Sequence, residues 1–303
     1  MHIVITGGTG LIGRALTTSL AQEGHRVTVL SRDPARHPSS VARGVTVTAW
    51  DPLRPEGWAG QLSGCDAVVN LAGAGVADTR WSAARKTLVR DSRVQAGQAL
   101  VAAIERISDR PRCLVQVSGA GYYGTRQSGP LGEEAPSGDD FLASVCRDWE
   151  ASTAAVEALG VRRVVTRIGI VLSRQGGALP RMLLPFRLFV GGPLGSGRQP
   201  FPWIHISDVI GAFRFLIDRQ DTAGVYNLAA PEFLDNAAFS RALGQVLHRP
   251  SLLPAPAPAL RLALGEMAML LLEGQQVSPE RLLSAGYAFR FTQAQKALLD
   301  ILA

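Results

Sequence analysis

The sequence predicts an α/β protein in which a doubly wound parallel sheet is joined to a smaller carboxyl-terminal domain. An apolar, β-branched stretch at 2–6 runs directly into glycines at GxxGxxG spacing, a pattern typical of the first strand and helix of such a sheet. Strand-like and helix-like patterns then alternate through residue 172, as crossovers between parallel strands require. Glycine-rich and proline-rich segments replace the alternation beyond this point. We therefore expect 1–172 to form the sheet domain, with 203–230 returning to it, and 173–202 and 231–303 to form the smaller domain.

The predicted elements follow in order along the chain. After a first helix that ends near Glu23, further strands are expected at 26–30, 45–49, 65–73, 112–118, 161–168 and 224–229. Helices are expected at 81–106, 141–159 and 207–219, with a partial helix at 57–64 and an extended segment at 202–206. Gly160 is a natural stop for the second of these helices, and Ser207 or Asp208 is the expected cap of the third.

The composition describes a compact soluble enzyme. Hydrophobic residues make up 47% of the 303 residues and charged residues 18%, which excludes a disordered chain. The formal charge of +6 comes almost wholly from scattered arginines, because Lys86 and Lys296 are the only lysines. No basic run or aromatic-interleaved stripe is present, so we expect no nucleic-acid partner.

The cysteines indicate a reducing compartment. Cys65, Cys113 and Cys146 are an odd number, with neither metal-ligand spacing nor a CxxC pair, so we expect a cytoplasmic protein without a metal site. Because the amino-terminal residues fit the first strand, we expect no signal peptide. The most apolar later stretch, 260–272, is short and contains Arg261 and Glu266, so we expect no membrane span.

The glycine loop predicts a dinucleotide site of the Rossmann type. Gly7 would permit the sharp strand-to-helix turn, Gly10 would let a pyrophosphate approach the backbone, and Gly13 would let helix and strand pack closely. Phosphate would lie at the positive end of the helix. The expected cofactor-binding residues of this loop also include Thr9, Leu11 and Ile12. A second small-residue loop, Leu71, Ala72 and Gly73, should pass the diphosphate or the nearby ribose.

The residues after the second strand favour NADP over NAD. NAD-binding proteins usually place an acidic residue there, whereas a 2′-phosphate needs positive charge and hydroxyl donors. The chain offers Ser31 and Arg32, with Arg36 nearby, and a guanidinium can hold a phosphate by paired charge-assisted hydrogen bonds. Asp33 is expected to face solvent. The alternative is that Arg32 is an ordinary loop arginine.

These motifs resemble a known family over essentially the whole chain. The glycine loop 7–13, the strand end 70–73, the segment 118–124 and the segment 203–208 resemble the extended short-chain dehydrogenase/reductases related to nucleotide-sugar epimerases. Within them the chain is similar to an atypical branch of NADP-dependent, epimerase-family proteins with a carboxyl-terminal region of unknown function. Further matching segments are 80–81, 92–93, 146–150, 176–178, 184–186, 191–197 and 271–277.

The resemblance implies a catalytic Ser, Tyr and Lys that this chain does not fully supply. The tyrosine donates or accepts the substrate proton, and the lysine lowers the pKa of that tyrosine and holds the nicotinamide ribose. The tyrosine position falls on Phe141 or Leu142 and the lysine position on Val145 or Cys146, while the usual serine position falls on Gly119. The standard hydride-plus-proton mechanism is therefore in doubt.

Three side chains are the candidates to replace the missing groups. Tyr122 and Tyr123 follow a strand end close to the expected nicotinamide position, so either is a candidate proton donor; packing under the loop is the alternative, favoured for Tyr123. Ser118 would bond either substrate or loop backbone. Cys146 is expected to be a buried, inert thiol, and Glu150 a surface or ion-pair residue.

Several charged residues have both a functional and a structural interpretation. Arg93 is a candidate cofactor ligand on the helix that follows the 71–73 loop, with a solvated helix face as the alternative. His205 and Asp208 fit a satisfied histidine and an N-cap better than a catalytic pair. Arg187 and Arg198 would bind an anionic substrate or lie exposed.

These observations lead to two functional hypotheses. The first is an NADP-dependent oxidoreductase or epimerase-like enzyme that acts on a small-molecule substrate, such as a nucleotide sugar or a small carbonyl compound. The second is a non-catalytic NADP(H)-binding regulator that reports redox state, which the missing Tyr and Lys favour. The sequence predicts no oligomeric state.

Overall fold

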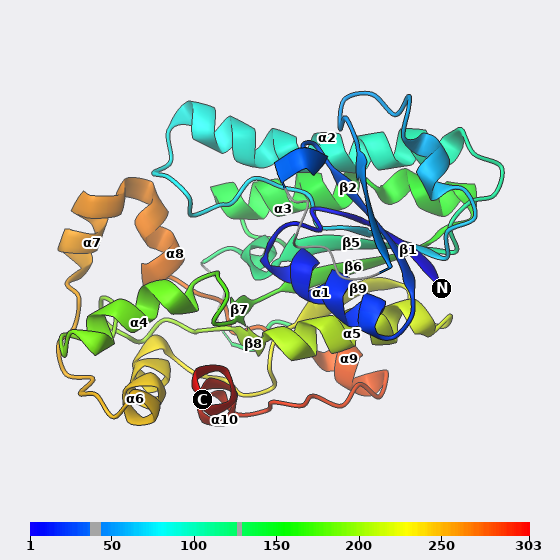
Figure 1. Cartoon of the computed structure of the whole chain (residues 1–303). Helices are drawn as coiled ribbons and strands as arrows, with labels where there is room; N and C mark the ends of the chain where they lie inside the picture. Colours follow the sequence, from blue (N-terminus) through cyan, green and yellow to red (C-terminus); the bar gives the residue numbers. More distant parts are fainter. Residues whose placement is uncertain (37–43, 126–128) are drawn as a thin grey trace.

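A computed structural model describes residues 1–36, 44–125 and 129–303 of the chain. Its main sheet has seven strands in the order β3-β2-β1-β4-β5-β6-β9, and every neighbouring pair is parallel (Figure 1). The strands are β1 His2–Thr6, β2 Arg26–Ser31, β3 Val45–Ala49, β4 Ala67–Asn70, β5 Cys113–Gly119, β6 Arg162–Ile168 and β9 Gly224–Leu228. The strand order reverses between β1 and β4, so the predicted doubly wound fold is confirmed.

Helices cover both faces of this sheet. On one face α1 (Leu11–Gln22) packs beside α5 (Ile206–Asp218), and on the other α2 (Ala83–Glu105) packs beside α3 (Phe141–Ala151) (Figure 1). Successive side chains of β1 point to opposite faces, so Ile3 and Ile5 join the cluster that contains Phe213, whereas Val4 joins the cluster that contains Leu100. The strands are apolar on both sides for this reason.

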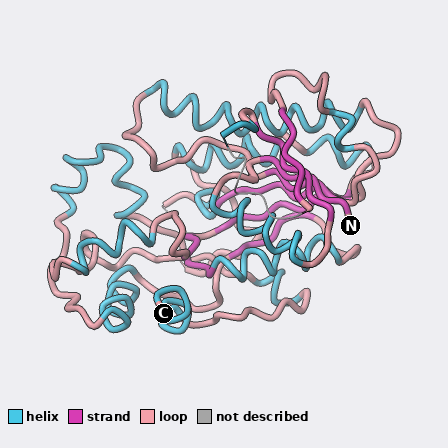
Figure 2. Tube along the Cα trace, in the orientation of Figure 1, coloured by secondary structure: helices cyan, strands magenta, loops and turns pink. Residues whose placement is uncertain are grey.

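Residues from β7 onward build a further hydrophobic cluster beside the sheet (Figure 2). Two short parallel strands, β7 (Ile170–Leu172) and β8 (Trp203–His205), form a small sheet of their own. The surrounding helices are α4 Leu179–Arg187, α6 Asn236–Leu247, α7 Ala257–Leu264, α8 Met269–Leu272, α9 Glu280–Ser284 and α10 Ala294–Leu302. Short 3₁₀ turns occur at Pro34–Arg36, Ala59–Leu62, Ala120–Tyr123, Ala154–Leu159 and Gly265–Ala268.

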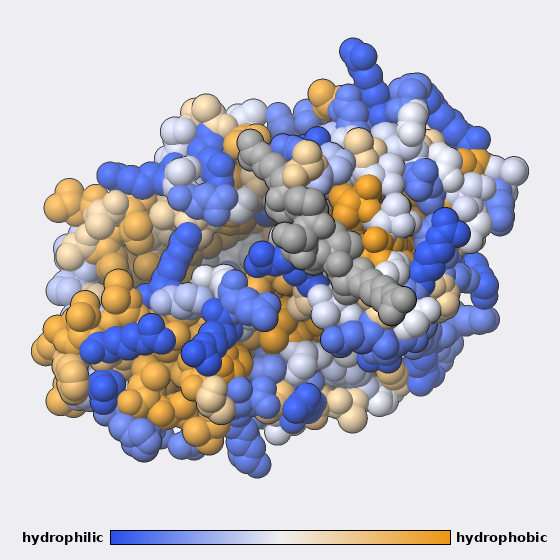
Figure 3. Space-filling model, viewed as in Figure 1, coloured by the Kyte–Doolittle hydropathy of each residue, from blue (hydrophilic) through white to orange (hydrophobic). Residues whose placement is uncertain are grey.

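The apolar surface is concentrated on this second part of the molecule. In Figure 3 hydrophobic residues gather over α4, α6 and α7. The exposed members include Leu188, Phe189, Leu252 and Leu262, of which Leu262 is 82% exposed. In the part of the chain that the structure describes, no helix combines the length and apolarity needed to span a bilayer.

Two local predictions are wrong. The expected helix 141–159 breaks after Ala151 and continues as a 3₁₀ turn, because the Ser152 hydroxyl donates back to the Trp149 carbonyl at 2.7 Å. Neither Ser207 nor Asp208 caps α5. The helix begins at Ile206, and its cap is His205, whose Nδ1 accepts from the Ser207 N–H at 3.1 Å.

Asp208 instead anchors the carboxyl-terminal segment. Its carboxylate accepts hydrogen bonds from the backbone N–H groups of Arg290 at 2.7 Å and Phe291 at 3.0 Å. The side chain is buried, and burial raises the pKa of this carboxyl despite those bonds. Asp208 therefore ties α5 to a segment 82 residues away.

Candidate functional site

The candidate site lies at the carboxyl ends of β1 and β4, where the strand order reverses and ligands bind in open parallel sheets. The chain leaves β1 through Gly7, whose φ is +67°. A Cβ on Gly7 would lie 2.6 Å from the Leu71 carbonyl oxygen, and one on Gly13 would lie 2.3 Å from the Gly7 oxygen. The turn and the close packing predicted for these two glycines match the structure.

Gly10 has a different environment. It is exposed, its φ of −76° suits any residue, and a Cβ there would meet only the Gly7 oxygen, at 3.4 Å. It precedes α1 without a side-chain cap, so the first-turn N–H groups, including those of Leu11 and Ile12, have no side-chain acceptor from this position. Thr9 lies beside it, partly exposed. Such a bare helix end is suited to a diphosphate.

The second loop faces the first across the strand switch. Leu71 donates its N–H to the Thr6 carbonyl at 3.2 Å, and Ala72 donates to the Asn70 side chain at 3.4 Å. A Cβ on Gly73 would lie 3.0 Å from the Arg93 side chain, so the loop passes directly over that residue. Only small residues allow the loop this path.

Arg93 supports the 71–74 loop from below. Its guanidinium donates to the carbonyls of Ala74 at 2.9 Å and Val89 at 2.8 Å, and it lies 4.8 Å from the centre of the Trp149 ring. Arg93 is 8% exposed, and burial lowers the pKa of its guanidinium. The alternative of a solvated helix face is wrong, because Arg93 is buried and its hydrogen bonds position the loop.

Ser31 and Arg32 lie at the carboxyl end of β2, next to the glycine loop. Ser31 is 9% exposed, and its hydroxyl accepts from the Asp33 N–H at 3.3 Å. Arg32 is exposed and able to meet a ligand at this edge. The side chain of Arg36 lies outside the described residues.

A buried polar ladder crosses the sheet beneath the site, and the sequence analysis missed it. Thr6 donates to Asn70 at 2.7 Å, Asn70 donates to Gln116 at 2.9 Å, and Gln116 donates to the Val117 carbonyl at 2.6 Å. The three side chains occupy matched positions on β1, β4 and β5 and are fully buried. Polar residues near the ends of three apolar strands were the available signal.

Tyr123 is locked inside the protein. It is fully buried, and its hydroxyl donates to Asn227 at 2.7 Å and accepts from Arg167 at 3.1 Å. Burial raises the pKa of this phenol. These contacts favour the packing alternative and place Tyr123 out of reach of a ligand.

Tyr122 stays partly exposed just past the end of β5. The Arg167 guanidinium carbon lies 3.3 Å from the centre of its ring, and Tyr123 packs edge-on against it. These contacts fix the orientation of the ring. Tyr122 is thus the more exposed of the two candidate tyrosines.

The expected Tyr and Lys positions carry an apolar pair. A Cβ on Gly121 would meet Leu142 at 3.3 Å, and the Cys146 thiol lies 3.7 Å from the Gly119 carbonyl, so Leu142 and Cys146 face the end of β5 from one side of α3. Burial raises the pKa of Cys146 to about 11, as expected for an inert thiol. Ser118 is 2% exposed and lies beside this thiol.

Arg167 organises the floor of this region, and the sequence analysis did not single it out. It pairs with both carboxylate oxygens of Glu150 and also donates to the Glu133 carbonyl at 3.1 Å. The Glu133 carboxylate in turn accepts from the Asn227 N–H at 3.0 Å, and burial raises the pKa of this carboxyl. An arginine near the carboxyl end of β6, after the buried Val164, Val165 and Thr166, was the available signal.

The segment after β7 packs against the glycine loop at Leu11. A Cβ on Gly177 would lie 3.1 Å from Leu11, and one on Gly176 would lie 3.5 Å from it. Arg181 on α4 donates to the Ala77 carbonyl at 2.9 Å and so reaches the chain beyond the second loop. Arg187 and Arg198 are both exposed. No group of three or more His, Cys, Asp or Glu side chains within the described ranges is arranged to hold a metal ion.

Comparisons with known proteins agree with this geometry. Residues 3–229 match the model of the NAD-dependent epimerase/dehydratase family, and residues 255–301 match a domain of unknown function, DUF1731. The epimerase family protein SDR39U1 of Bos taurus is 41% identical to this chain, and the match covers 100% of both proteins. The epimerase family protein YfhF of Bacillus subtilis is 35% identical, and the match covers 100% of this chain and 98% of YfhF.

A solved relative has the same fold over its whole length. The crystal structure of human epimerase family protein SDR39U1 (isoform 2) with NADPH superposes with a TM-score of 0.89 at 38% identity and covers 99% of each chain. The family match spans the sheet, the glycine loop and the second loop described above. The chain therefore belongs to the NAD-dependent epimerase/dehydratase family of NAD(P)-binding proteins.

Proposed function

We propose that this protein is an NADP-dependent oxidoreductase or epimerase-like enzyme that acts on a small carbonyl compound or a nucleotide-sugar-like molecule. The observation that carries the proposal is the position of Tyr122. It is a partly exposed tyrosine just past the carboxyl end of β5, on the edge of the sheet that also carries the glycine loop.

The described residues fit a dinucleotide with a 2′-phosphate. Gly10 and the uncapped start of α1 leave room and N–H groups for the diphosphate, and the 71–73 loop forms the opposite wall. Exposed Arg32, with Ser31 beside it, supplies the charge that a 2′-phosphate needs. The human relative with NADPH supports the same choice of cofactor.

The chemistry would be divided between cofactor and protein. The nicotinamide, when bound, supplies or accepts hydride. Tyr122 would give a proton to the substrate oxygen or take one from it, with its ring held by Arg167. Ser118 and Cys146 are buried and shape the wall of the site.

A second candidate function is non-catalytic binding of NADP(H) as a redox sensor. The apolar pair Leu142 and Cys146 favours it, because these residues occupy the face where a Tyr and a Lys would activate the substrate. Both the enzyme and the sensor would bind NADPH, so the affinity for NADPH alone would not distinguish between them.

The test is stereospecific transfer of deuterium from labelled NADPH to a panel of nucleotide sugars and small carbonyl compounds. The enzyme proposal expects transfer to at least one compound, with a large loss in Tyr122→Phe and little change in Tyr226→Phe, a control on the outer strand β9. Tight NADPH binding without transfer to any compound would instead establish the sensor. Full activity in Tyr122→Phe would remove Tyr122 as the proton donor.

A further inference from the structure

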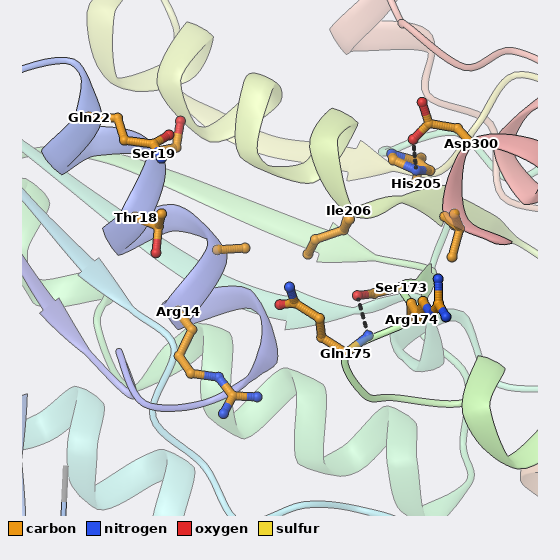
Figure 4. Close-up of a pocket in the computed structure, with 12 residues that line it drawn as sticks. Arg14, Thr18, Ser19, Gln22, Ser173, Arg174, Gln175, His205, Ile206 and Asp300 are labelled. Carbon is orange, nitrogen blue, oxygen red and sulfur yellow. Dashed lines mark hydrogen bonds and ion pairs between the residues drawn. The ribbon is translucent and has the colours of Figure 1, made fainter. Parts of the chain in front are cut away.

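A second cavity lies apart from the dinucleotide site. It is an open pocket with a volume of about 810 Å³, bordered by α1, the turn after β7, the start of α5 and the end of α10 (Figure 4). Its lining begins at Arg14, one residue beyond the glycine loop, and continues along α1 to Gln22. The volume falls within the range of small-molecule sites, about 300–1,000 Å³.

Two guanidinium groups border this cavity from different elements. Arg14 comes from α1 and Arg174 from the turn after β7 (Figure 4). Both are exposed, and neither forms an ion pair with a carboxylate side chain among the described residues; Arg174 donates only a long bond of 3.4 Å to the Ala303 carbonyl. The cavity therefore has two positive charges available to a ligand.

The one acidic side chain of the lining is already compensated. Asp300 lies 3.7 Å from the Arg290 guanidinium and 3.4 Å from Nε2 of His205. His205 uses Nδ1 to accept the Ser207 N–H, which places the proton of the neutral ring on Nε2, where it has no hydrogen-bond partner among the described residues. Arg14 and Arg174 therefore outnumber the one carboxylate of the lining.

The remaining walls provide hydrogen-bond donors over an apolar base. Thr18 and Gln175 contribute a hydroxyl and an amide group, while Ala15, Ile206 and Ile301 contribute apolar surface. The Ser19 hydroxyl, also in the lining, donates to Glu23 at 3.2 Å. Paired guanidinium and hydroxyl donors are the groups that recognise carboxylates and phosphates. We propose that this cavity binds a small organic anion that carries carboxylate or phosphate groups.

Calorimetric titration of the full chain, without dinucleotide, with citrate and separately with inorganic phosphate tests the proposal. We expect saturable binding of at least one probe, weakened about tenfold or more in Arg14→Gln/Arg174→Gln, because two charge-assisted contacts are lost. Circular dichroism and the melting temperature would show that this variant is folded. Arg241→Gln, on the exposed face of α6, controls for the loss of positive charge, and Arg32→Gln controls for anion binding at the dinucleotide site.

Each outcome decides the proposal. Preference for citrate would assign a carboxylate ligand, and preference for phosphate a phosphorylated one. The proposal is overturned if neither probe binds, if the double variant binds as well as the wild type, or if Arg32→Gln alone abolishes binding.

Discussion

The guanidinium of Arg167 donates to both carboxylate oxygens of Glu150, and each of the two hydrogen bonds is 2.9 Å long. The side chains are only 4% and 12% exposed, so the pair holds strand β6 to helix α3 inside the protein. The same guanidinium supports the rings of Tyr122 and Tyr123. One ion pair therefore positions the proposed proton donor without touching a ligand.

Removing the charge of Glu150 should destabilise the fold strongly. Glu150→Gln leaves the Arg167 charge buried without its partner, which should cost about 3–5 kcal/mol of unfolding free energy in urea denaturation. The control is Glu157→Gln, which breaks the half-exposed pair with Arg163 and should cost less than about 1 kcal/mol. Equal, small losses in the two variants would contradict the structural role of the buried pair.

Alanine at two glycines of the loop should separate binding from folding. Gly13→Ala places a methyl group 2.3 Å from the Gly7 oxygen and should lower the melting temperature. Gly10→Ala has room for the methyl group, so it should melt like the wild type yet bind NADPH more weakly, since the methyl enters the space expected for the diphosphate. Fluorescence titration and thermal denaturation measure the two effects. Unchanged NADPH affinity in a folded Gly10→Ala would argue against a diphosphate at this position.

Arg32→Gln should weaken NADPH binding by about tenfold or more, because the 2′-phosphate loses a charge-assisted contact. NADH affinity should change little, since NADH lacks that phosphate. Arg26→Gln, exposed at the opposite end of β2, is the matched control. Retention of NADPH preference in Arg32→Gln would show that another residue reads the phosphate.

His205 should make stability depend on pH. Burial lowers the pKa of its imidazole from 6.5 to about 4, so the unfolded chain takes up a proton at a higher pH than the folded protein. The resulting stabilisation is complete above pH 6.5 and is lost as the pH falls toward 4, by about 3 kcal/mol in total.

Denaturation of wild type and His205→Asn across this pH range measures the effect. Asparagine keeps an acceptor for the Ser207 N–H but does not titrate, so the stability difference between the two proteins should change by the amount given above. His248→Asn, at an exposed position with φ of +54°, should follow the wild-type profile. Parallel profiles for all three proteins would contradict the assignment.

The predictable features were those with local causes. Gly7 and Gly13 could be placed from sequence because the constraint on each acts within a few residues, through a positive φ and a short contact. The doubly wound parallel sheet followed from the alternation of strands and helices and from crossover handedness. The absence of the Tyr and Lys pair was also visible in the sequence, because it depends only on which residues occupy those positions.

The features that were missed depend on contacts between distant segments. Tyr123 meets Asn227 across 104 residues, so the sequence alone could not decide whether the phenol faced the cleft or the core. Aspartate is a residue type favoured at helix caps, yet the Asp208 carboxylate accepts hydrogen bonds from two N–H groups of the carboxyl-terminal segment instead. Arg93 was placed on the correct helix, but its burial depends on the loop that lies over it.

The turn after β7 lies between the pocket beside α1 and the glycine loop. Its residues Ser173 to Gln175 line the cavity beside α1, and the next two, Gly176 and Gly177, rest on Leu11 of the glycine loop. A ligand in the pocket and a dinucleotide on the glycine loop would therefore lie on either side of the same short turn.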